Sequence, residues 1–235
     1  MYFDWTYIVI VLPMVIFSLI ASARVNSTFN KYEKVLSKKG LTGREAARMV
    51  LDNNGLSYIN IEKVNGKLTD HYDPKANVIR LSESVYSSTS TAAIGVAAHE
   101  AGHAVQHSQG YTPMKIRSAI IPVTNIGSQL GMVLIMIGII MMYYSEFFIN
   151  VAYAGVILYS AVAVFQLVTL PVEFNASSRA LASLSQYGIL DEEELKSSKK
   201  VLSAAAMTYV AALAVSIATI LRFLLIIGGR SNRRE

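Results

Sequence analysis

The sequence contains no cysteine, so neither a disulfide framework nor a thiolate metal site can form. Any metal in this protein must therefore be held by nitrogen and oxygen atoms. Charged residues are also scarce, at 16% of the 235 residues, whereas hydrophobic residues make up 53%. With a mean hydropathy of +0.40, this composition is too apolar for an ordinary soluble domain.

Charge is absent from three long stretches and almost absent from a fourth. They cover residues 5–23, 120–144, 147–172 and 201–228, and only the last is interrupted, by Arg222. Each is close to the roughly 20 residues that a helix needs to cross a bilayer. We therefore expect four transmembrane helices rather than the buried core helices of a soluble bundle.

The first stretch could also be interpreted as a secretory signal. Ala21-Ser22-Ala23 resembles a signal-peptidase site. However, no basic residue precedes the apolar run, and Asp4 lies where such a signal needs Lys or Arg. The sequence therefore favours a retained membrane helix.

Most basic residues lie beside these apolar stretches and give the chain a net charge of +5. This placement favours contact with the lipid bilayer and its anionic lipids over nucleic-acid binding, for which there is no motif. Four crossings would place residues 24–119 and 173–200 on one side of the membrane. Lys and Arg residues near the ends of the membrane segments favour a cytoplasmic location for that side. The basic C-terminal tail, which would lie on the other side, favours the opposite orientation.

Local signals predict two helices in the first polar segment. Residues 24–39 are expected to form a polar helix that ends at Gly40. A second helix is expected to begin at Thr42, which forms a capping-box pattern with Glu45, and to end at Asn53.

The period then changes to that of β-strands. Residues 56–64 alternate in strand fashion, Asn65-Gly66 is a strong hairpin signal, and residues 67–71 would form the return strand. A turn over 72–77 precedes a short strand. We interpret Asn77–Leu81 either as an edge strand that binds an extended peptide or as a purely structural edge.

The strongest chemical signal is His99-Glu100-Ala101-Gly102-His103. On a helix, His99 and His103 project from one face about a turn apart and can bind one zinc ion. Glu100 can then act as the general base for a zinc-activated water. A helix is predicted over 91–108, because serine and threonine residues that can cap it precede it and Gly110 and Pro113 follow it. The alternative is a pair of hydrogen-bonded core histidines.

Catalytic zinc needs a third protein ligand. His107 continues the spacing, but on an unbroken helix it would lie about 12 Å along the axis from His99. Glu173, which follows Pro171 at the end of an apolar stretch, is the better candidate. Alternatively, Glu173 is a lone glutamate at the membrane interface. The acidic run 191–194 is a poorer ligand candidate, because it is typical of the solvated first turn of a helix.

Several segments together resemble the YugP-type membrane zinc metallopeptidases of bacteria. They are Asp70-His71-Tyr72-Asp73-Pro74, the strand through Leu81, residues 98–107 and Pro171-Val172-Glu173-Phe174. The resemblance covers nearly the whole chain, including the order of the membrane segments. It implies a bacterial cell-membrane protein with a gluzincin-like site and one Zn²⁺ per chain, held by His99, His103 and Glu173, with Glu100 as general base.

One position departs from the family pattern. Asn175 stands where that pattern usually has Asp. A carboxylate that orients a ligand histidine would then be replaced by an amide, which can accept a hydrogen bond but carries no charge. Activity could be reduced, although His99, Glu100 and His103 are all present.

The predicted fold class is a mainly α membrane protein with four transmembrane helices and a small α+β zincin-like metallopeptidase domain on one face. The expected segments are transmembrane helices over 1–23, 120–144, 147–172 and 201–228, a metallopeptidase region over 24–119, a third-ligand segment over 173–200 and a basic tail over 229–235.

The predicted function is zinc-dependent endopeptidase activity on membrane-associated or misfolded proteins. Candidate residues for the oxyanion, the substrate or the support of the ligands are His71, Asn77, His107, Asn175, Arg179 and Tyr187. The alternative is a catalytically weak or inactive zinc-binding scaffold or chaperone-like partner. Membrane-protein partners and homo-oligomers both remain open.

Overall fold

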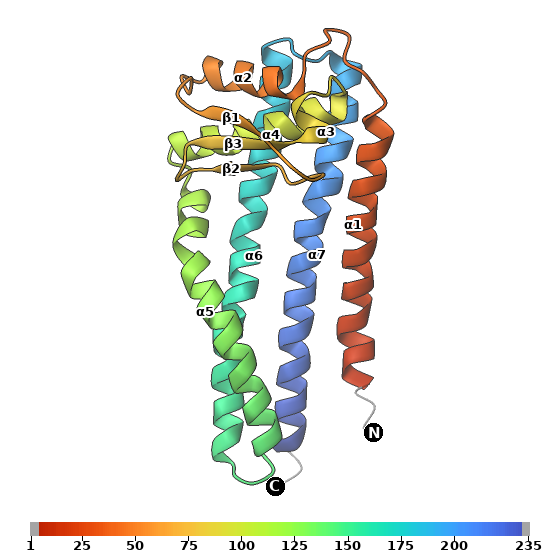
Figure 1. Cartoon of the computed structure of the whole chain (residues 1–235). Helices are drawn as coiled ribbons and strands as arrows, with labels where there is room; N and C mark the ends of the chain where they lie inside the picture. Colours follow the sequence, from red (N-terminus) through yellow and green to blue (C-terminus); the bar gives the residue numbers. More distant parts are fainter. Residues whose placement is uncertain (1–4, 232–235) are drawn as a thin grey trace. The chain divides into compact units, whose positions relative to one another are not determined.

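The structure is a computed structural model that describes residues 5–231, and the chain is mainly helical (Figure 1). It divides into two compact units. One unit contains residues up to Ile20, Ile116–Leu170 and residues from Thr208 onward, and the other contains Ala21–Lys115 and Pro171–Met207. Asp4, which argues above against a secretory signal, and residues 232–235 of the basic tail lie outside the described residues.

Four helices within the described residues are long and apolar enough to cross a membrane, as predicted. These candidate spans are Tyr7–Tyr32, Thr112–Met141, Phe147–Gln186 and Glu192–Gly229. The corresponding elements are η1 (Tyr7–Val11) with α1 (Leu12–Tyr32), α5 (Thr112–Met141), α6 (Phe147–Gln186) and α7 (Glu192–Ser231). Each helix extends beyond the uncharged stretch that predicted it.

In the first unit, small residues bring α5 and α6 into close contact. A Cβ added to Gly127 would lie 2.8 Å from the Leu158 carbonyl oxygen, and one added to Gly138 would lie 2.6 Å from the Ala152 Cβ. Apolar helices in a bilayer gain no hydrophobic free energy by leaving the lipid, so they associate through close packing at small residues. A core that includes Ile135 fills the space beside these contacts.

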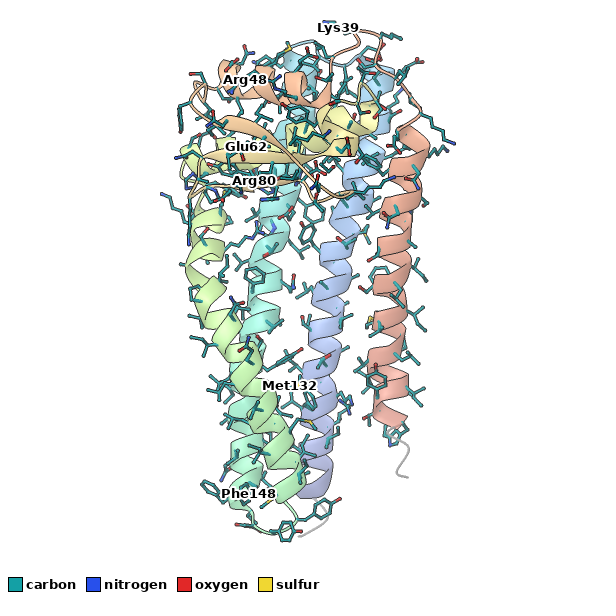
Figure 2. All side chains as sticks on the ribbon, in the orientation of Figure 1. Lys39, Arg48, Glu62, Arg80, Met132 and Phe148 are labelled. Atoms are coloured by element: carbon teal, nitrogen blue, oxygen red, sulfur yellow. The ribbon has the colours of Figure 1, made fainter. Side chains whose placement is uncertain are left out.

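The second unit is built around α4 (Thr91–Ser108), whose bounds agree with the predicted helix. Its alanine-rich surface is buried against α2 (Gly43–Asn53), α6 and α7 in one apolar core. The predicted capping box of α2 is present, because the Thr42 Oγ accepts from the Glu45 N–H. Charged side chains gather on this unit, with Arg48, Glu62 and Arg80 labelled among them (Figure 2).

The sheet has three strands, β1 (Asn60–Val64), β2 (His71–Asp73) and β3 (Val78–Ser82), in the order β1-β3-β2. β1 pairs parallel with β3, so the predicted hairpin at Asn65-Gly66 is wrong. The hairpin lies instead between β2 and β3, which are antiparallel. β3 is the most buried strand and takes the central position, so the predicted edge strand Asn77–Leu81 is wrong as well. β2 is an edge strand.

The predicted helix over 24–39 is only partly correct. α1 continues without a break to Tyr32 and stops well before Gly40. Beyond it, the Ser37 N–H donates to the Thr89 carbonyl, and the Thr91 N–H donates to the Val35 carbonyl. These long-range backbone bonds outweigh the local helical preference. A short helix that the sequence did not predict, α3 (Glu83–Tyr86), joins the sheet to α4.

Candidate metal centre

The two histidines of the motif lie on one face of α4. The helix begins where the Ser90 Oγ accepts a hydrogen bond from the Ala93 N–H. One turn apart, the rings of His99 and His103 meet edge to face with centroids 4.6 Å apart. Their side chains are only 15% and 10% exposed, so both imidazoles lie in a largely desolvated environment.

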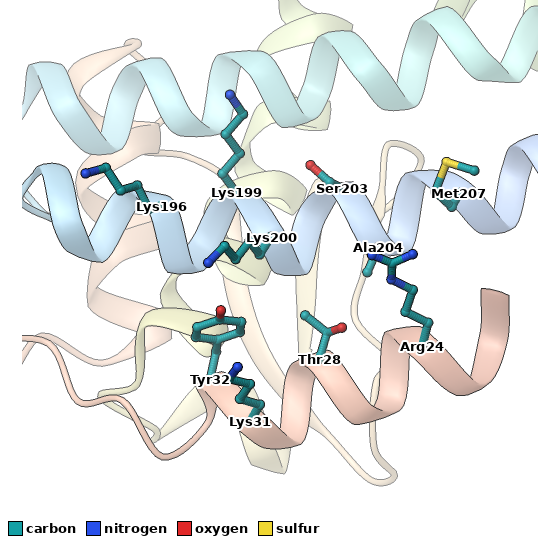
Figure 3. Close-up of a pocket in the computed structure, with 10 residues that line it drawn as sticks. All are labelled: Arg24, Thr28, Lys31, Tyr32, Lys196, Lys199, Lys200, Ser203, Ala204 and Met207. Atoms are coloured by element: carbon teal, nitrogen blue, oxygen red, sulfur yellow. The ribbon is translucent and has the colours of Figure 1, made fainter. Parts of the chain in front are cut away.

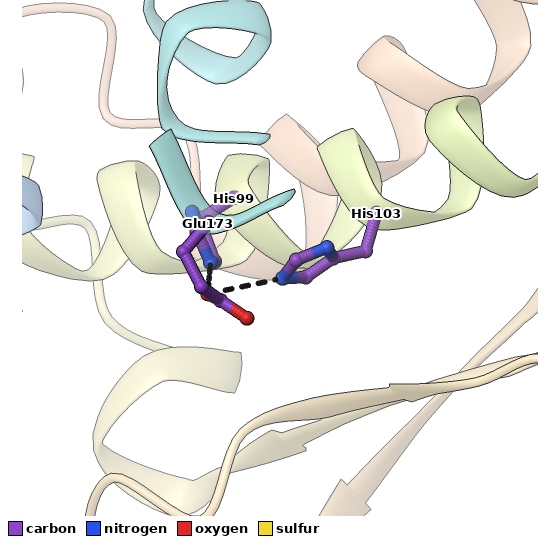
Figure 4. A group of neighbouring side chains, drawn as sticks. All are labelled: His99, His103 and Glu173. Atoms are coloured by element: carbon purple, nitrogen blue, oxygen red, sulfur yellow. Dashed lines mark ion pairs between the residues drawn. The ribbon is translucent and has the colours of Figure 1, made fainter. Parts of the chain in front are cut away.

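Glu173 on α6 approaches both imidazoles (Figure 4). Its Oε2 lies 3.3 Å from the His99 Nε2 and 3.5 Å from the His103 Nε2, and its side chain is 4% exposed. The possible ligand atoms of these three residues all lie within 4.8 Å of one another. Two segments more than sixty residues apart in sequence therefore converge on one point.

This geometry fits a zinc ion. Zinc bonds of roughly 2.0–2.1 Å in a tetrahedral arrangement place neighbouring ligand atoms about 3.3 Å apart. The two distances from Glu173 Oε2 are close to that value. Two imidazole nitrogens and one carboxylate oxygen also form a donor set typical of catalytic zinc, with a fourth position left for water or substrate.

The other ring nitrogen of each histidine has a neutral partner. The His99 Nδ1 lies 3.1 Å from the Ser177 Oγ on α6, and the His103 Nδ1 lies 3.0 Å from the Gln106 Oε1. When each Nδ1 carries the proton, it donates to these oxygens and leaves the Nε2 lone pair directed at the shared point. The Gln106 oxygen can only accept, so it selects this tautomer for His103, and the Ser177 hydroxyl can accept from the same tautomer of His99.

Gln106 connects the ligand histidine to α6. Its fully buried Nε2 donates to the Val172 carbonyl at 2.8 Å and to the Asn175 Oδ1 at 2.9 Å. The same Asn175 oxygen accepts from the Arg179 Nε at 2.6 Å. Asn175 thus reaches His103 through Gln106. The lack of a carboxylate at residue 175 would therefore act on His103 only through Gln106, and its effect on activity stays a prediction.

Glu100 is 8% exposed and lies beside the cluster. Burial alone would lower the pKa of His103, but the carboxylates of Glu173 and Glu100 outweigh it, so the pKa is raised above its usual value. Burial also raises the pKa of Asp70, opposed by hydrogen bonds from Ser82 and reinforced by the charge of Glu100. The carboxyl group of Asp70 is therefore close enough to Glu100 for the charge of Glu100 to raise its pKa.

β2 places Tyr72 next to α4, beyond the two histidines of the motif. The Tyr72 Oη lies 3.3 Å from the His107 Nδ1, one turn beyond His103 on α4. Burial, with smaller effects of Tyr58 and Asp73, raises the pKa of Tyr72 to about 12. The phenol therefore keeps its proton at neutral pH and remains a hydrogen-bond donor.

The other candidate residues lie elsewhere. His71 and Asp73 both face Arg80, so strand alternation places His71 on the face opposite Tyr72. Asn77 is exposed at the β2–β3 turn with φ of 51°. Tyr187 contacts Asn54 and follows Glu173 by fourteen residues, about 20 Å along α6.

Arg179 is directed toward the end of α4. Its guanidinium also donates to the Gln109 Oε1 at 2.6 Å and lies 5.9 Å from the Tyr111 ring centre. The sequence reasoning missed Tyr72, Gln106 and Ser177. Strand alternation next to the helix that carries the two histidines could have indicated Tyr72, but the other two depend on how α4 packs against α6.

Comparisons with known proteins agree with this geometry. A family described as "Putative neutral zinc metallopeptidase" matches residues 7–228. The chain is also 47% identical over 213 residues to the "Putative membrane protease YugP" of Bacillus subtilis, a match that covers 90% of this chain and 92% of that protein. No solved structure matches. The chain therefore belongs to the family described as "Putative neutral zinc metallopeptidase".

Proposed function

We propose that this protein is an integral-membrane zinc endopeptidase in which His99, His103 and Glu173 hold the ion. The observation that carries the proposal is the approach of the Glu173 Oε2 to within 3.3 and 3.5 Å of the two Nε2 atoms. When bound there, zinc supplies a Lewis acid that lowers the pKa of water and polarises a peptide carbonyl.

Glu100 is the proposed general base. It follows the first ligand directly and is buried beside the second, so its carboxylate can accept a proton from the attacking water. The same group then donates that proton to the leaving amine nitrogen. Ser177 and Gln106 hold the two ligand rings in position throughout.

The proposed substrate is an extended stretch of a membrane-associated or misfolded protein. β2 lies at the edge of the sheet, and Tyr72 on it contacts the helix that carries the histidines. An extended peptide can pair with such an edge through its backbone and place one peptide bond at the zinc. β2 thus takes the role that the sequence had assigned to residues 77–81.

Tyr72 and His107 are the proposed donors to the oxyanion. Their contact orders both side chains one turn beyond His103, and the tyrosine stays protonated at neutral pH. A donor fixed before the reaction stabilises charge on the tetrahedral intermediate more than a mobile one does.

We further propose that the protein is a multi-pass component of a bacterial cell membrane, with the site on the cytoplasmic face. The four candidate spans support the multi-pass arrangement, and the lysines next to them support the orientation.

Cleavage of an unfolded substrate tests the proposal. Purified full-length protein with zinc is expected to cut fluorescently labelled, denatured casein, and a chelator should stop it. Glu100→Gln should lower the rate at least about 100-fold while zinc content stays near one per chain. Glu193→Gln, which removes an exposed carboxylate from α7, is the matched control. Equal, chelator-insensitive cleavage by all three proteins would refute the proposal, and zinc binding without cleavage would favour the scaffold.

A further inference from the structure

A pocket lies between α1 and α7, within the unit that also holds the candidate metal centre (Figure 3). Its volume of about 710 Å³ is in the range of small-molecule sites. The pocket is lined by five basic side chains, Arg24, Lys31, Lys196, Lys199 and Lys200. No acidic side chain lines it, so it is strongly electropositive.

These cations have no carboxylate to neutralise them. Among residues 5–231, no Asp or Glu oxygen is within ion-pair distance of any of the five. Elsewhere in this unit lysines do form such pairs, as Lys63 does with Glu83 at 2.6 Å. Five cations gathered around one cavity without a carboxylate favour an anionic occupant.

Two of the cations lie close to the ring of Tyr32. Its ring is 9% exposed, and the ammonium groups of Lys31 and Lys200 lie 5.6 and 5.7 Å from its centre. Figure 3 shows both groups near the tyrosine in the space between the two helices. Two like charges held by one ring repel each other, and an anion between them offsets that repulsion.

The pocket changes character along its length. The three lysines on α7 directly precede the uncharged stretch that begins at Val201. Ala204 and Met207 then continue the lining about 10 Å farther along the same helix, where Thr28 and Arg24 face it from α1. On α7 the lining thus changes from lysines to Ala204 and Met207, which matches a phosphate group with an attached acyl chain better than a free anion.

We propose that this pocket binds an anionic phospholipid, with its phosphate held by Lys31 and Lys200. The hydroxyl groups of Ser203 and Thr28 are available to the headgroup and glycerol oxygens. The beginning of one acyl chain lies along Ala204 and Met207. This site is separate from the metal centre and does not depend on the peptidase proposal.

Native mass spectrometry of the full-length protein in a neutral detergent tests the site. Phosphatidylglycerol is expected to add one per chain at least about tenfold more tightly than phosphatidylcholine, and inorganic phosphate should not bind at the same concentration. Lys31→Gln with Lys200→Gln should weaken phosphatidylglycerol binding about 25-fold, since each basic residue near an anionic lipid contributes roughly fivefold.

Lys63→Gln with Lys75→Gln removes the same charge away from the pocket and should leave lipid binding unchanged. A circular dichroism spectrum and a thermal unfolding midpoint like those of wild type show that each variant is folded. Equal binding of both lipids, or unchanged binding by the pocket variant, would overturn the proposal. Inorganic phosphate that binds as tightly as the lipid and is lost in the same variant would overturn the lipid assignment.

Discussion

Gly102 of α4 and Ala176 of α6 are in close contact between the two elements that carry the proposed ligands. A Cβ added to Gly102 would lie 2.7 Å from the Ala176 carbonyl oxygen, which a real side chain cannot occupy. The absence of a side chain at residue 102 therefore allows α6 to approach α4 closely enough for Glu173 to reach both imidazoles.

Gly102→Ala is expected to separate the two helices at the metal centre. The clash is with backbone, so overpacking should cost about 1–3 kcal/mol of stability, and zinc affinity should fall at least about tenfold. Thermal unfolding and competition with a zinc chelator measure the two effects. Gly228→Ala, where an added Cβ meets nothing within 4 Å, is the control. Zinc affinity equal to wild type would show that the close contact does not position Glu173.

Glu173→Ala tests the third ligand directly. If roughly 10–16 kcal/mol of zinc binding is shared among about four ligands, losing one should weaken binding about 100-fold or more. Metal content after dialysis against buffered zinc measures this loss, and Glu193→Gln serves again as the control. Full zinc occupancy in the Glu173 variant at the lowest free zinc would remove this residue from the ligand set.

Gln106→Ala should weaken zinc binding without removing a ligand. The His103 ring loses the acceptor that fixes its tautomer, for which a loss of about 10–100-fold is typical. The Val172 carbonyl also loses its buried donor, which should lower stability by about 1–3 kcal/mol. The exposed Gln186→Ala is the comparison. A variant that loses stability but keeps wild-type zinc affinity would assign Gln106 a purely structural role.

Asp70→Asn should reveal the cost of ionising a half-buried carboxyl group. Burial raises the pKa of Asp70 above the unfolded value of 3.8, so the folded state binds this proton more tightly than the unfolded state. Wild-type stability therefore falls relative to the Asn variant as pH rises from below 3.8 through the raised pKa.

Thermal unfolding of both proteins without metal, at pH 4 and pH 7, measures that difference. Titration of the histidines is common to both and cancels in the comparison. The Asn variant should gain relative stability between the two values. A gain by wild type instead would mean that hydrogen bonds from Ser82, and not burial, dominate the pKa of Asp70.

Tyr72→Phe should lower kcat about 10–100-fold with little change in KM or zinc content. The phenol is proposed to donate only to charge that develops during the reaction, so its loss acts on the transition state. Tyr58→Phe, at an exposed tyrosine, is the comparison. A change confined to KM would assign Tyr72 to substrate binding.

Local sequence signals predicted those elements whose boundaries are set locally. The α4 helix begins and ends where its caps indicated, and the Thr42 capping box starts α2. The proximity of Glu173 to the histidines was also expected, because a carboxylate at the end of an apolar stretch needs a partner. Its role as a ligand remains a prediction.

Long-range pairing was not predictable from the same signals. Asn65-Gly66 indicated a turn correctly placed between strands, but which strands pair depends on burial of Val78, Ile79 and Leu81. The partners of the ligand histidines likewise depend on how two helices pack, because Ser177 lies 78 residues from His99 in sequence. Contacts of this kind produce no hydrophobic periodicity in either segment from which they could be predicted.

The neutral partners of the two histidines have a consequence for metal supply. A serine hydroxyl and a glutamine amide fix the rings but add no negative charge, unlike an aspartate in the same place. The imidazoles are therefore weaker electron donors than histidines paired with a carboxylate, and a zinc ion bound by them would be held less tightly. We expect zinc to exchange readily with chelators, so that the fraction of loaded protein follows the concentration of free zinc around it.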